Sequence, residues 1–362
     1  MLFTLDQIGR SITRYEDGRG RANPQFHPIF QRLRMSSAAS QQCQTTAAPP
    51  LRSASRLLKA AKWLVLVLLL GAFAAYLWAN QSEFQRLLDL SGITVLQVVM
   101  GRAIAYLALI GATIYCLRRY APNLNSLEFL AASSAGTILS LPGAVQAAKS
   151  AYLKGRHGVE FQRSVAIGGV IVVVALSAAS LTALIGLAWL ETHGHANLHL
   201  LWLLSAFTLF GASLILVFVG RLPKTGRLQR FAYFPETWAQ VVGDRRRMLT
   251  VAALLCVRSL SSFLAFGLLF AALANVPNGL VVGGVVDALT FALRLVMITP
   301  GNLGVYEWVV AILSSSVGST LATGLACAAI YRAAGLLVTG SAGLISVLLL
   351  GGARDYRKES VK

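Results

Sequence analysis

The sequence predicts an all-α polytopic membrane protein, and three observations carry this prediction. Of the 362 residues, 56% are hydrophobic and 13% are charged, which is more apolar than an ordinary soluble domain. The apolar residues gather in segments that approach the ~20 residues a helix needs to cross ~30 Å of hydrocarbon. The Lys and Arg residues fall mostly on alternate loops between these segments. We predict about six full spans plus two helical hairpins broken at Pro-Gly, which enter from opposite faces.

Seven hydrophobic segments define the elements in order. They are Trp63–Ala79, Thr94–Leu117, Ser164–Leu190, Leu198–Val219, Leu249–Leu273, Gly279–Val317 and Leu321–Leu350. Six of them have the length of a single crossing. Gly279–Val317 is long enough for two limbs, so it is predicted to be a hairpin.

The distribution of positive charge predicts the orientation. Ten Lys and Arg residues precede Trp63, six lie in Arg118–Arg163, seven in Arg221–Arg247 and four after Leu350. The predicted outer loops then contain only Arg86. Because cytoplasmic loops are enriched in Lys and Arg, both termini are predicted to be cytoplasmic, in a bacterial-type inner membrane. The net charge of +18 is therefore assigned to an anionic leaflet rather than to nucleic acid.

Three regions follow from composition. Residues 1–59 form a basic, low-complexity arm that is predicted to be disordered and cytoplasmic, with Met35 as a second candidate for the first residue. Residues 60–352 form the membrane domain, and residues 353–362 a basic cytoplasmic tail. The four cysteines have no paired spacing, and His193, His195 and His199 share a short polar loop. No metal site, disulfide framework or cofactor is predicted from them.

The first predicted hairpin lies among cytoplasmic charges. Ser126–Leu141 is an apolar stretch that starts and ends near Lys and Arg, so a full crossing would invert every later loop. It should dip into the bilayer, turn at Pro142 and Gly143, and return as Ala144–Leu153. Gly279–Val317 is predicted to form a similar hairpin that enters from the opposite face of the membrane, with a break at Pro300 and Gly301. Two such hairpins are typical of inverted repeats with a substrate site near mid-bilayer, whereas two ordinary Pro kinks are the alternative.

Ionisable residues inside the apolar segments are the main site candidates, because burying them in a bilayer is costly. Asp287 and Arg294 are two helical turns apart and share a face, so they are one candidate pair; a second candidate pair is Glu307 with Arg332. The alternative is that these ion pairs are purely structural and hold the hairpin against a neighbouring helix. Arg258 adds a further positive charge in the fifth span, unless its side chain extends to the cytoplasmic surface.

The break after Pro300 and Gly301 suggests the chemistry of the site. A new helix should begin near Gly304, and its unpaired N–H groups would suit a phosphate. Pro142 and Gly143 would begin the corresponding half-helix of the first hairpin. The predicted lipid-binding residues are therefore Pro142, Gly143, Arg258, Arg294, Pro300, Gly301, Gly304, Glu307 and Arg332.

The run Thr299-Pro300-Gly301-Asn302-Leu303-Gly304-Val305-Tyr306-Glu307, followed by Tyr331-Arg332, resembles the membrane region of lysylphosphatidylglycerol synthases, also called flippase-like. Leu141-Pro142-Gly143 with Gly155-Arg156 is similar to another landmark of that family. The resemblance implies a lipid-translocating or lipid-handling membrane domain. It also implies a stand-alone member, because no aminoacyl-transfer domain follows the membrane region.

Two departures place the predicted site at the second hairpin. Where relatives commonly have Gly-Glu after the first Pro-Gly, this chain has Gln146-Ala147. Where many relatives carry a charged face on the next helix, Ile171–Ala175 is wholly apolar.

We therefore expect a protein that translocates or handles an anionic, phosphate-linked lipid and is not an enzyme. No nucleotide-binding loop and no large soluble domain are present in the sequence. The alternative is a membrane subunit that presents a polyprenyl-linked or hopanoid-type lipid to a separate glycosyltransferase or lipid-modifying enzyme, with Arg221–Arg247 as the contact. A small-solute transporter is a third reading, which would normally have more polar central helices.

Overall fold

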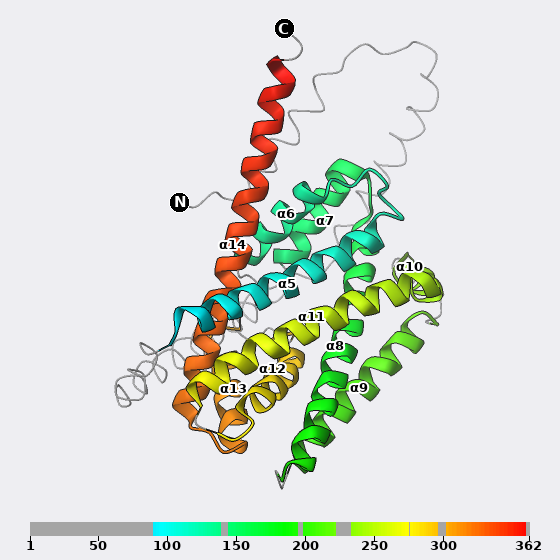
Figure 1. Cartoon of the computed structure of the whole chain (residues 1–362). Coiled ribbons are helices and arrows are strands. Elements are labelled where there is room, and N and C mark those ends of the chain that lie inside the picture. The colour runs from blue at the N-terminus through cyan, green and yellow to red at the C-terminus, as the bar shows by residue number, and fades with distance from the viewer. Residues whose placement is uncertain are drawn as a thin grey trace, which may run out of the picture. The chain divides into compact units, whose positions relative to one another are not determined.

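The structure, a computed structural model, describes residues 90–138, 144–194, 198–221, 233–274, 276–295 and 302–359 (Figure 1). All of these belong to one compact unit, Ala60–Lys362. Within the described ranges the regular structure is helical and contains no strand, which confirms the predicted all-α fold class. The predicted arm, residues 1–59, and the first predicted span, Trp63–Ala79, lie outside the described residues.

Five of the described helices are long and apolar enough to cross a membrane. They are α5 (Gly92–Leu117), α8 (Phe161–Thr192), α9 (His199–Val219), α11 (Arg245–Leu273) and α14 (Leu321–Glu359), whose apolar part is Leu321–Leu350. These correspond to five of the six predicted single crossings. The helix α14 continues past the apolar part into the predicted tail.

Side-chain caps explain where two of these helices begin. The Ser91 hydroxyl accepts a hydrogen bond from the Thr94 N–H at 3.2 Å, and α5 starts at Gly92. The Asp244 carboxylate accepts one from the Arg247 N–H at 3.1 Å. The helix α11 therefore begins at Arg245, one turn before the predicted Leu249, since hydropathy alone does not register a capping carboxylate.

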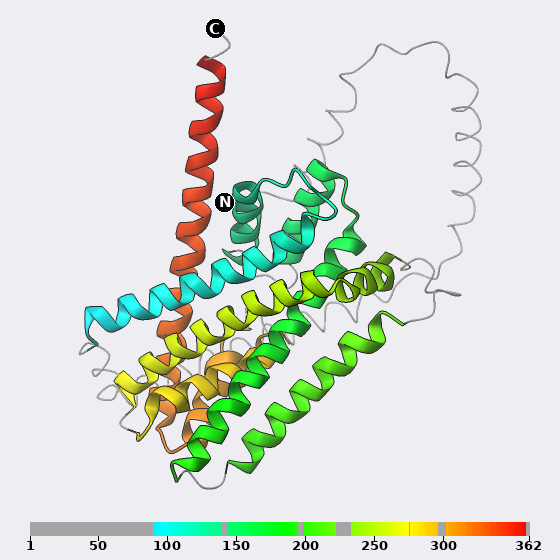
Figure 2. The same cartoon turned by 45° about the vertical axis from the view of Figure 1, so that its right-hand side comes forward.

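The core centres on α8 and α11. The most apolar window of α8 is 61% buried, whereas that of α9 is 17% buried and leaves Phe207 and Phe210 exposed. Exposed large apolar side chains on a span suit contact with lipid tails. Figures 1 and 2 both show α11 running beside α5, and α11 also packs against α12 (Gly279–Leu295).

Glycines set the spacing between α11 and α12. A Cβ atom on Gly267 would overlap the carbonyl group of Leu280, and one on Gly283 would overlap the side chain of Phe270. Small residues let two membrane helices approach closely. The close approach brings the polar face of α12 against α11.

The first predicted hairpin consists of α6 (Ser126–Ile138) and α7 (Ala144–His157). Its turn, with Pro142 and Gly143, lies outside the described residues. The Glu128 carboxylate joins the limbs, because it accepts hydrogen bonds from the Tyr152 hydroxyl and from Arg156, both at 3.0 Å. The helix α7 extends past the predicted end at Leu153 to His157, since basic residues are favourable in the last turn of a helix.

The second hairpin consists of α12 and α13 (Val305–Ser316), with residues 296–301 outside the described ranges. A helix with the 12 residues of α13 is only about 18 Å long, at about 1.5 Å per residue. It is therefore shorter than the ~30 Å of a full crossing. Figures 1 and 2 show α6 and α7 at one end of the bundle, and α12 and α13 toward the other.

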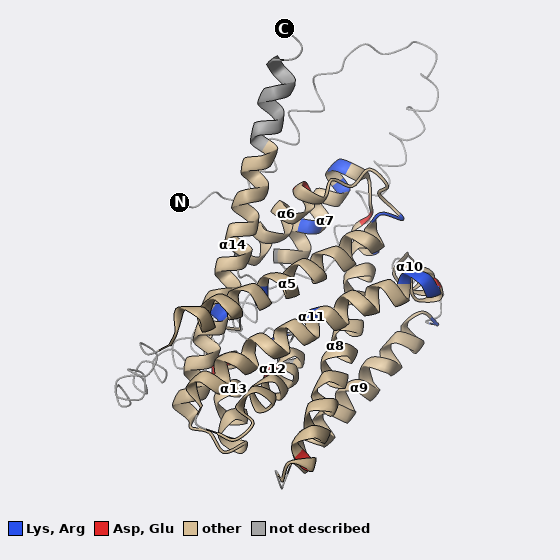
Figure 3. Cartoon of the chain, viewed as in Figure 1, with Lys and Arg blue, Asp and Glu red and all other residues tan. Residues whose placement is uncertain are grey.

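The described Lys and Arg residues gather mainly at one end. Figure 3 shows them on the loops and helix ends near α7 and at the start of α11, next to α10 (Tyr233–Gly243), with few acidic residues among them. Arg119 donates to the Gln240 carbonyl at 3.3 Å, which ties the loop after α5 to α10. We refer to this end, where α5 finishes and α8 and α11 begin, as the basic end.

Candidate functional site

The second hairpin brings Asp287 and Arg294 into contact on α12. Arg294 donates a hydrogen bond from Nη2 to the carboxylate of Asp287. Asp287 is only 3% exposed. Arg294 also donates to the Tyr306 hydroxyl on α13 at 2.9 Å. The side-chain amide of Asn302 donates to the Arg294 carbonyl oxygen at 3.1 Å. One arginine thus links the two limbs across the break.

The second predicted pair is also formed. Arg332 on α14 donates from Nη1 to Glu307 Oε1 at 2.6 Å, and the two are tied together inside apolar helices. Sequence alone left open which of the two pairs would exist. Both exist in the structure: the first lies within α12, and the second joins α13 to α14.

Glu307 also caps the helix that it starts. Its Oε2 atom accepts a hydrogen bond from the Gly304 N–H at 2.8 Å. Gly304 has a φ angle of +82°, a conformation that glycine adopts without steric cost, and α13 begins at the next residue. A carboxylate already stands at the helix N-terminus that the sequence predicts for a phosphate. The Gly304 N–H that the sequence assigns to a phosphate is therefore already engaged by Glu307.

Tyr331 is the point where four helices meet. The guanidinium carbons of Arg102 on α5 and Arg294 on α12 lie 4.5 Å and 5.5 Å from the centre of its ring. Its hydroxyl lies 3.3 Å from the Ser262 carbonyl oxygen on α11, to which it donates, and 3.5 Å from Asp287. The aromatic ring stabilises both cations through its negative face.

Arg258 points inward from α11. It is 9% exposed, and its guanidinium carbon lies 4.1 Å from the centre of the Phe291 ring on α12. The alternative that Arg258 extends to the cytoplasmic surface is therefore wrong. Neighbouring Ser259 is buried and lies 3.2 Å from the Thr182 hydroxyl on α8.

Charge in this region is unbalanced. We define the arginine cluster as Arg102, Arg258, Arg294 and Arg332 together with the carboxylates of Asp287 and Glu307. Among the described residues, Arg102 and Arg258 form no ion pair, and the Nε atom of Arg102 is buried without a hydrogen-bond partner. Four cations thus face two carboxylates. Unpaired cations in an apolar region are costly, so this excess suits an anionic ligand.

Most of the cluster is predicted by the sequence. Arg258, Arg294, Gly304, Glu307 and Arg332 are found in it or at its edge, while Pro142, Gly143, Pro300 and Gly301 lie outside the described residues. Arg102, Tyr306 and Tyr331 are not among the predicted site residues. Arg102 carries the same signal as the others, a charge within an apolar helix, but nothing in the sequence shows that α5 turns it toward α14.

Comparison with known protein families assigns the chain to one of them. Residues 63–343 match the model of the family described as the lysylphosphatidylglycerol synthase TM region, and the match includes both hairpins and the whole arginine cluster. No curated protein and no solved structure shows a significant match. The chain therefore belongs to the family of the lysylphosphatidylglycerol synthase transmembrane region, and it is a multi-pass membrane protein of a lipid-handling family.

Proposed function

We propose that this protein translocates an anionic, phosphate-linked lipid between the leaflets of a bacterial-type inner membrane, with both termini cytoplasmic, and leaves the lipid chemically unchanged. The observation that carries the proposal is the excess of positive charge in the arginine cluster, inside helices that are otherwise apolar. The resemblance of the chain to a lipid-handling family supports the same class of substrate.

Arginine suits the phosphate of a lipid headgroup. Its planar guanidinium group donates two parallel hydrogen bonds to phosphate oxygens, and it stays charged when it is desolvated. The side chains of Arg294 and Arg332 are 22% and 21% exposed, so a headgroup has access to them. Arg102 and Arg258 rest on aromatic rings rather than on carboxylates, so their charges are not neutralised before the lipid arrives.

The two carboxylates would make the binding reversible. Asp287 and Glu307 hold Arg294 and Arg332 in place while the site is empty. When a phosphate binds, it competes with these carboxylates for the same donors, which limits the net gain in binding free energy. A headgroup bound in this way can be released to the opposite leaflet.

The test is lipid movement in proteoliposomes. Fluorescent phosphatidylglycerol, its lysyl derivative and a polyprenyl-phosphate sugar are compared, with the Glu307→Gln protein beside wild type and empty liposomes as background. We expect wild type to move at least one phosphate-linked probe, and Glu307→Gln to slow it by about tenfold or more, because Arg332 loses the charge of its partner while the side-chain oxygen of Gln can still accept from the Gly304 N–H.

Two outcomes would contradict the proposal. Equal movement in wild type and Glu307→Gln would remove the arginine cluster from the mechanism. If correctly folded wild type moves none of the probes, translocation is overturned. That result would favour a subunit that presents the lipid to a separate enzyme. Co-purification would then identify the enzyme.

A further inference from the structure

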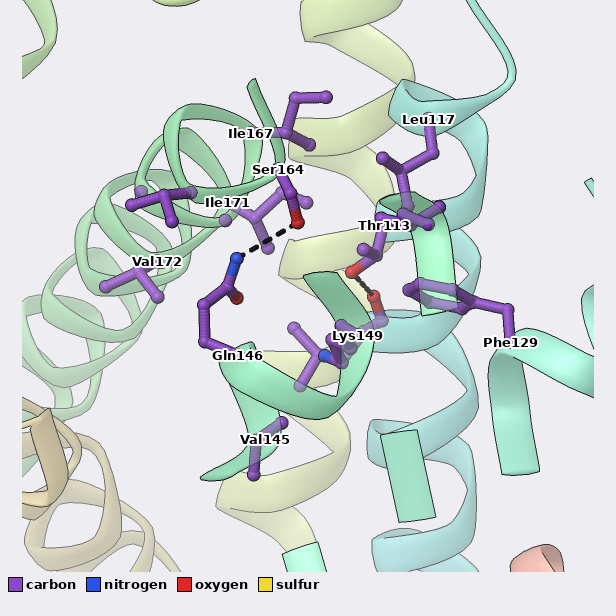
Figure 4. Close-up of a pocket in the computed structure, with 15 residues that line it drawn as sticks. Thr113, Leu117, Phe129, Val145, Gln146, Lys149, Ser164, Ile167, Ile171 and Val172 are labelled. Atoms are coloured by element: carbon purple, nitrogen blue, oxygen red, sulfur yellow. Dashed lines mark hydrogen bonds between the residues drawn. The ribbon is translucent and has the colours of Figure 1, made fainter. Parts of the chain in front are cut away.

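A second candidate binding site lies in the first hairpin, away from the arginine cluster. The helices α5, α6, α7 and α8 enclose a cavity of about 400 Å³ (Figure 4). This volume falls within the ~300–1,000 Å³ typical of small-molecule sites. Its walls are mainly apolar, with Leu109 from α5, Phe129 from α6 and Val172 from α8 among them.

The polar groups of the cavity come chiefly from α7. Gln146 and Lys149 lie one turn apart on this helix, and Figure 4 shows both beside the cavity, with Ser164 of α8 opposite. The Gln146 amide donates to the Ser164 hydroxyl at 3.2 Å. The Thr113 hydroxyl of α5 also lines the cavity and donates to the Leu109 carbonyl oxygen at 2.8 Å.

Lys149 is the only charged residue that lines this cavity in the part of the chain that the structure describes. Its Nζ atom lies 5.7 Å from the centre of the Phe129 ring, and no described residue forms an ion pair or hydrogen bond with it. The nearby carboxylate of Glu128 is engaged by Arg156 and Tyr152 instead. A cation in a mainly apolar cavity, with no carboxylate in its walls, lacks a counter-ion.

The cavity lies near the basic end of the bundle. It is lined by the last turns of α5, with Thr113 and Leu117, and by the first turns of α8, with Ser164 and Ile167. Arg118 and Arg163 follow and precede these turns in the sequence. Clustered basic residues at a membrane surface attract anionic lipids, so the local concentration of such headgroups is raised at this end.

We propose that this cavity is a second lipid site, distinct from the arginine cluster, which binds the phosphate of an anionic lipid through Lys149, Gln146 and Ser164 and rejects headgroups that carry an amine. Lys149 neutralises the phosphate, while the amide and hydroxyl groups satisfy its remaining oxygens. The walls at Ile171 and Val172 contact the first part of an acyl or prenyl chain. An aminoacylated headgroup would place a second cation beside Lys149 with no carboxylate to receive it.

This inference rests on the proposed function for its choice of a lipid, but it is tested by binding rather than by movement. The full-length protein is placed in nanodiscs that contain equal amounts of phosphatidylglycerol and its lysyl derivative, and the lipid retained on the protein is counted by native mass spectrometry. Wild type should retain phosphatidylglycerol in preference to the lysyl derivative. Lys149→Gln should lower that preference by about tenfold, and Lys149→Arg should keep it.

Reversing the charge of Lys149 and adding inorganic phosphate are two further tests of the lipid site. Lys149→Glu should reverse the preference toward the lysyl derivative. Inorganic phosphate at millimolar concentration should not displace the retained lipid, because it lacks the chain that contacts the apolar walls. Displacement by inorganic phosphate would overturn the lipid as ligand and leave an anion site.

The remaining outcomes separate this inference from the proposed function. Unchanged retention in Lys149→Gln, with the Lys149→Arg protein equally well folded, would overturn the second site. Arg332→Gln should abolish lipid movement and lower the total lipid retained, yet keep the preference for phosphatidylglycerol over its lysyl derivative. Loss of movement with an unchanged preference therefore bears on the arginine cluster, and loss of preference with Lys149→Gln bears on the cavity.

Discussion

Arg294 on α12 and Tyr306 on α13 are joined by a hydrogen bond of 2.9 Å across the break of the second hairpin. The same guanidinium group lies 4.6 Å from the centre of the Tyr306 ring. The contact ties α12 to α13 across the break. It also places the tyrosine next to the ion pair of Arg294 with Asp287.

Replacing Tyr306 with Phe tests this link. The variant keeps the ring against Arg294 and removes only the hydroxyl that accepts the hydrogen bond. We expect a loss of about 1–2 kcal/mol in the free energy of unfolding, because Arg294 loses one partner in a buried region. Thermal unfolding in detergent measures the change, and Tyr115→Phe, at a tyrosine of α5 that is 40% exposed, is the matched control. Equal unfolding midpoints for the two variants would show that the hydroxyl does not tie the limbs.

Asp287 is expected to matter for stability more than for substrate contact. Asp287→Asn leaves the partly exposed Arg294 without its carboxylate, and since breaking a fully buried pair costs about 3–5 kcal/mol, we expect a loss below that range. The double variant Asp287→Asn with Arg294→Gln removes both charges, so it should regain most of the stability while lipid movement stays lost. A double-mutant cycle on the unfolding midpoints measures the coupling. Additive effects of the two changes would contradict a direct pair.

Arg102 is expected to matter for lipid movement more than for stability. Its Nε atom is buried without a hydrogen-bond partner, and it forms no ion pair with the described residues. Arg102→Gln is therefore expected to leave the unfolding midpoint unchanged or raised, since an uncompensated cation is removed, while lipid movement falls. Arg246→Gln, on the exposed first turn of α11, is the control for a simple loss of charge. A strongly destabilised Arg102→Gln protein would show that Arg102 is structural.

The glycine contacts between α11 and α12 predict a steric effect. A Cβ atom on Gly283 would overlap Phe270, so Gly283→Ala must push α12 away from α11. We expect a loss of about 1–3 kcal/mol, as for other overpacked positions. Gly211→Ala on α9, where no atom lies within 4 Å of the added methyl group, should be neutral. Similar unfolding midpoints for the two alanine variants would argue against the close packing.

The sequence predicts the spans and the members of the two ion pairs well, because hydropathy and buried charge are local signals. Asp287 and Arg294 share a face of one helix, so their pairing follows from helical spacing alone. The contact between Arg102 and Tyr331 does not, since it depends on how α5 crosses α14. Similarly, the Glu307 cap on Gly304 requires the positive φ angle of the glycine, which no periodicity reveals.

The role of the apolar residues near the start of α8 could not be predicted from the sequence. Ile171 and Val172 look uninformative in the sequence, and they weaken the case for a site in the first hairpin. In the structure they form one wall of the cavity that contains Lys149. Lys149 itself resembles an ordinary cytoplasmic residue until the packing of α7 against α6 and α8 is known.

In the proposed function, the unpaired charges of Arg102 and Arg258 attract the lipid phosphate. The most direct measurement is the initial rate of phosphatidylglycerol movement in proteoliposomes for wild type and for the double variant Arg102→Gln with Arg258→Gln. Both ion pairs remain intact in that variant, so we predict a normally folded protein that moves the probe at least about tenfold more slowly. Movement at the wild-type rate by the folded double variant would contradict the account.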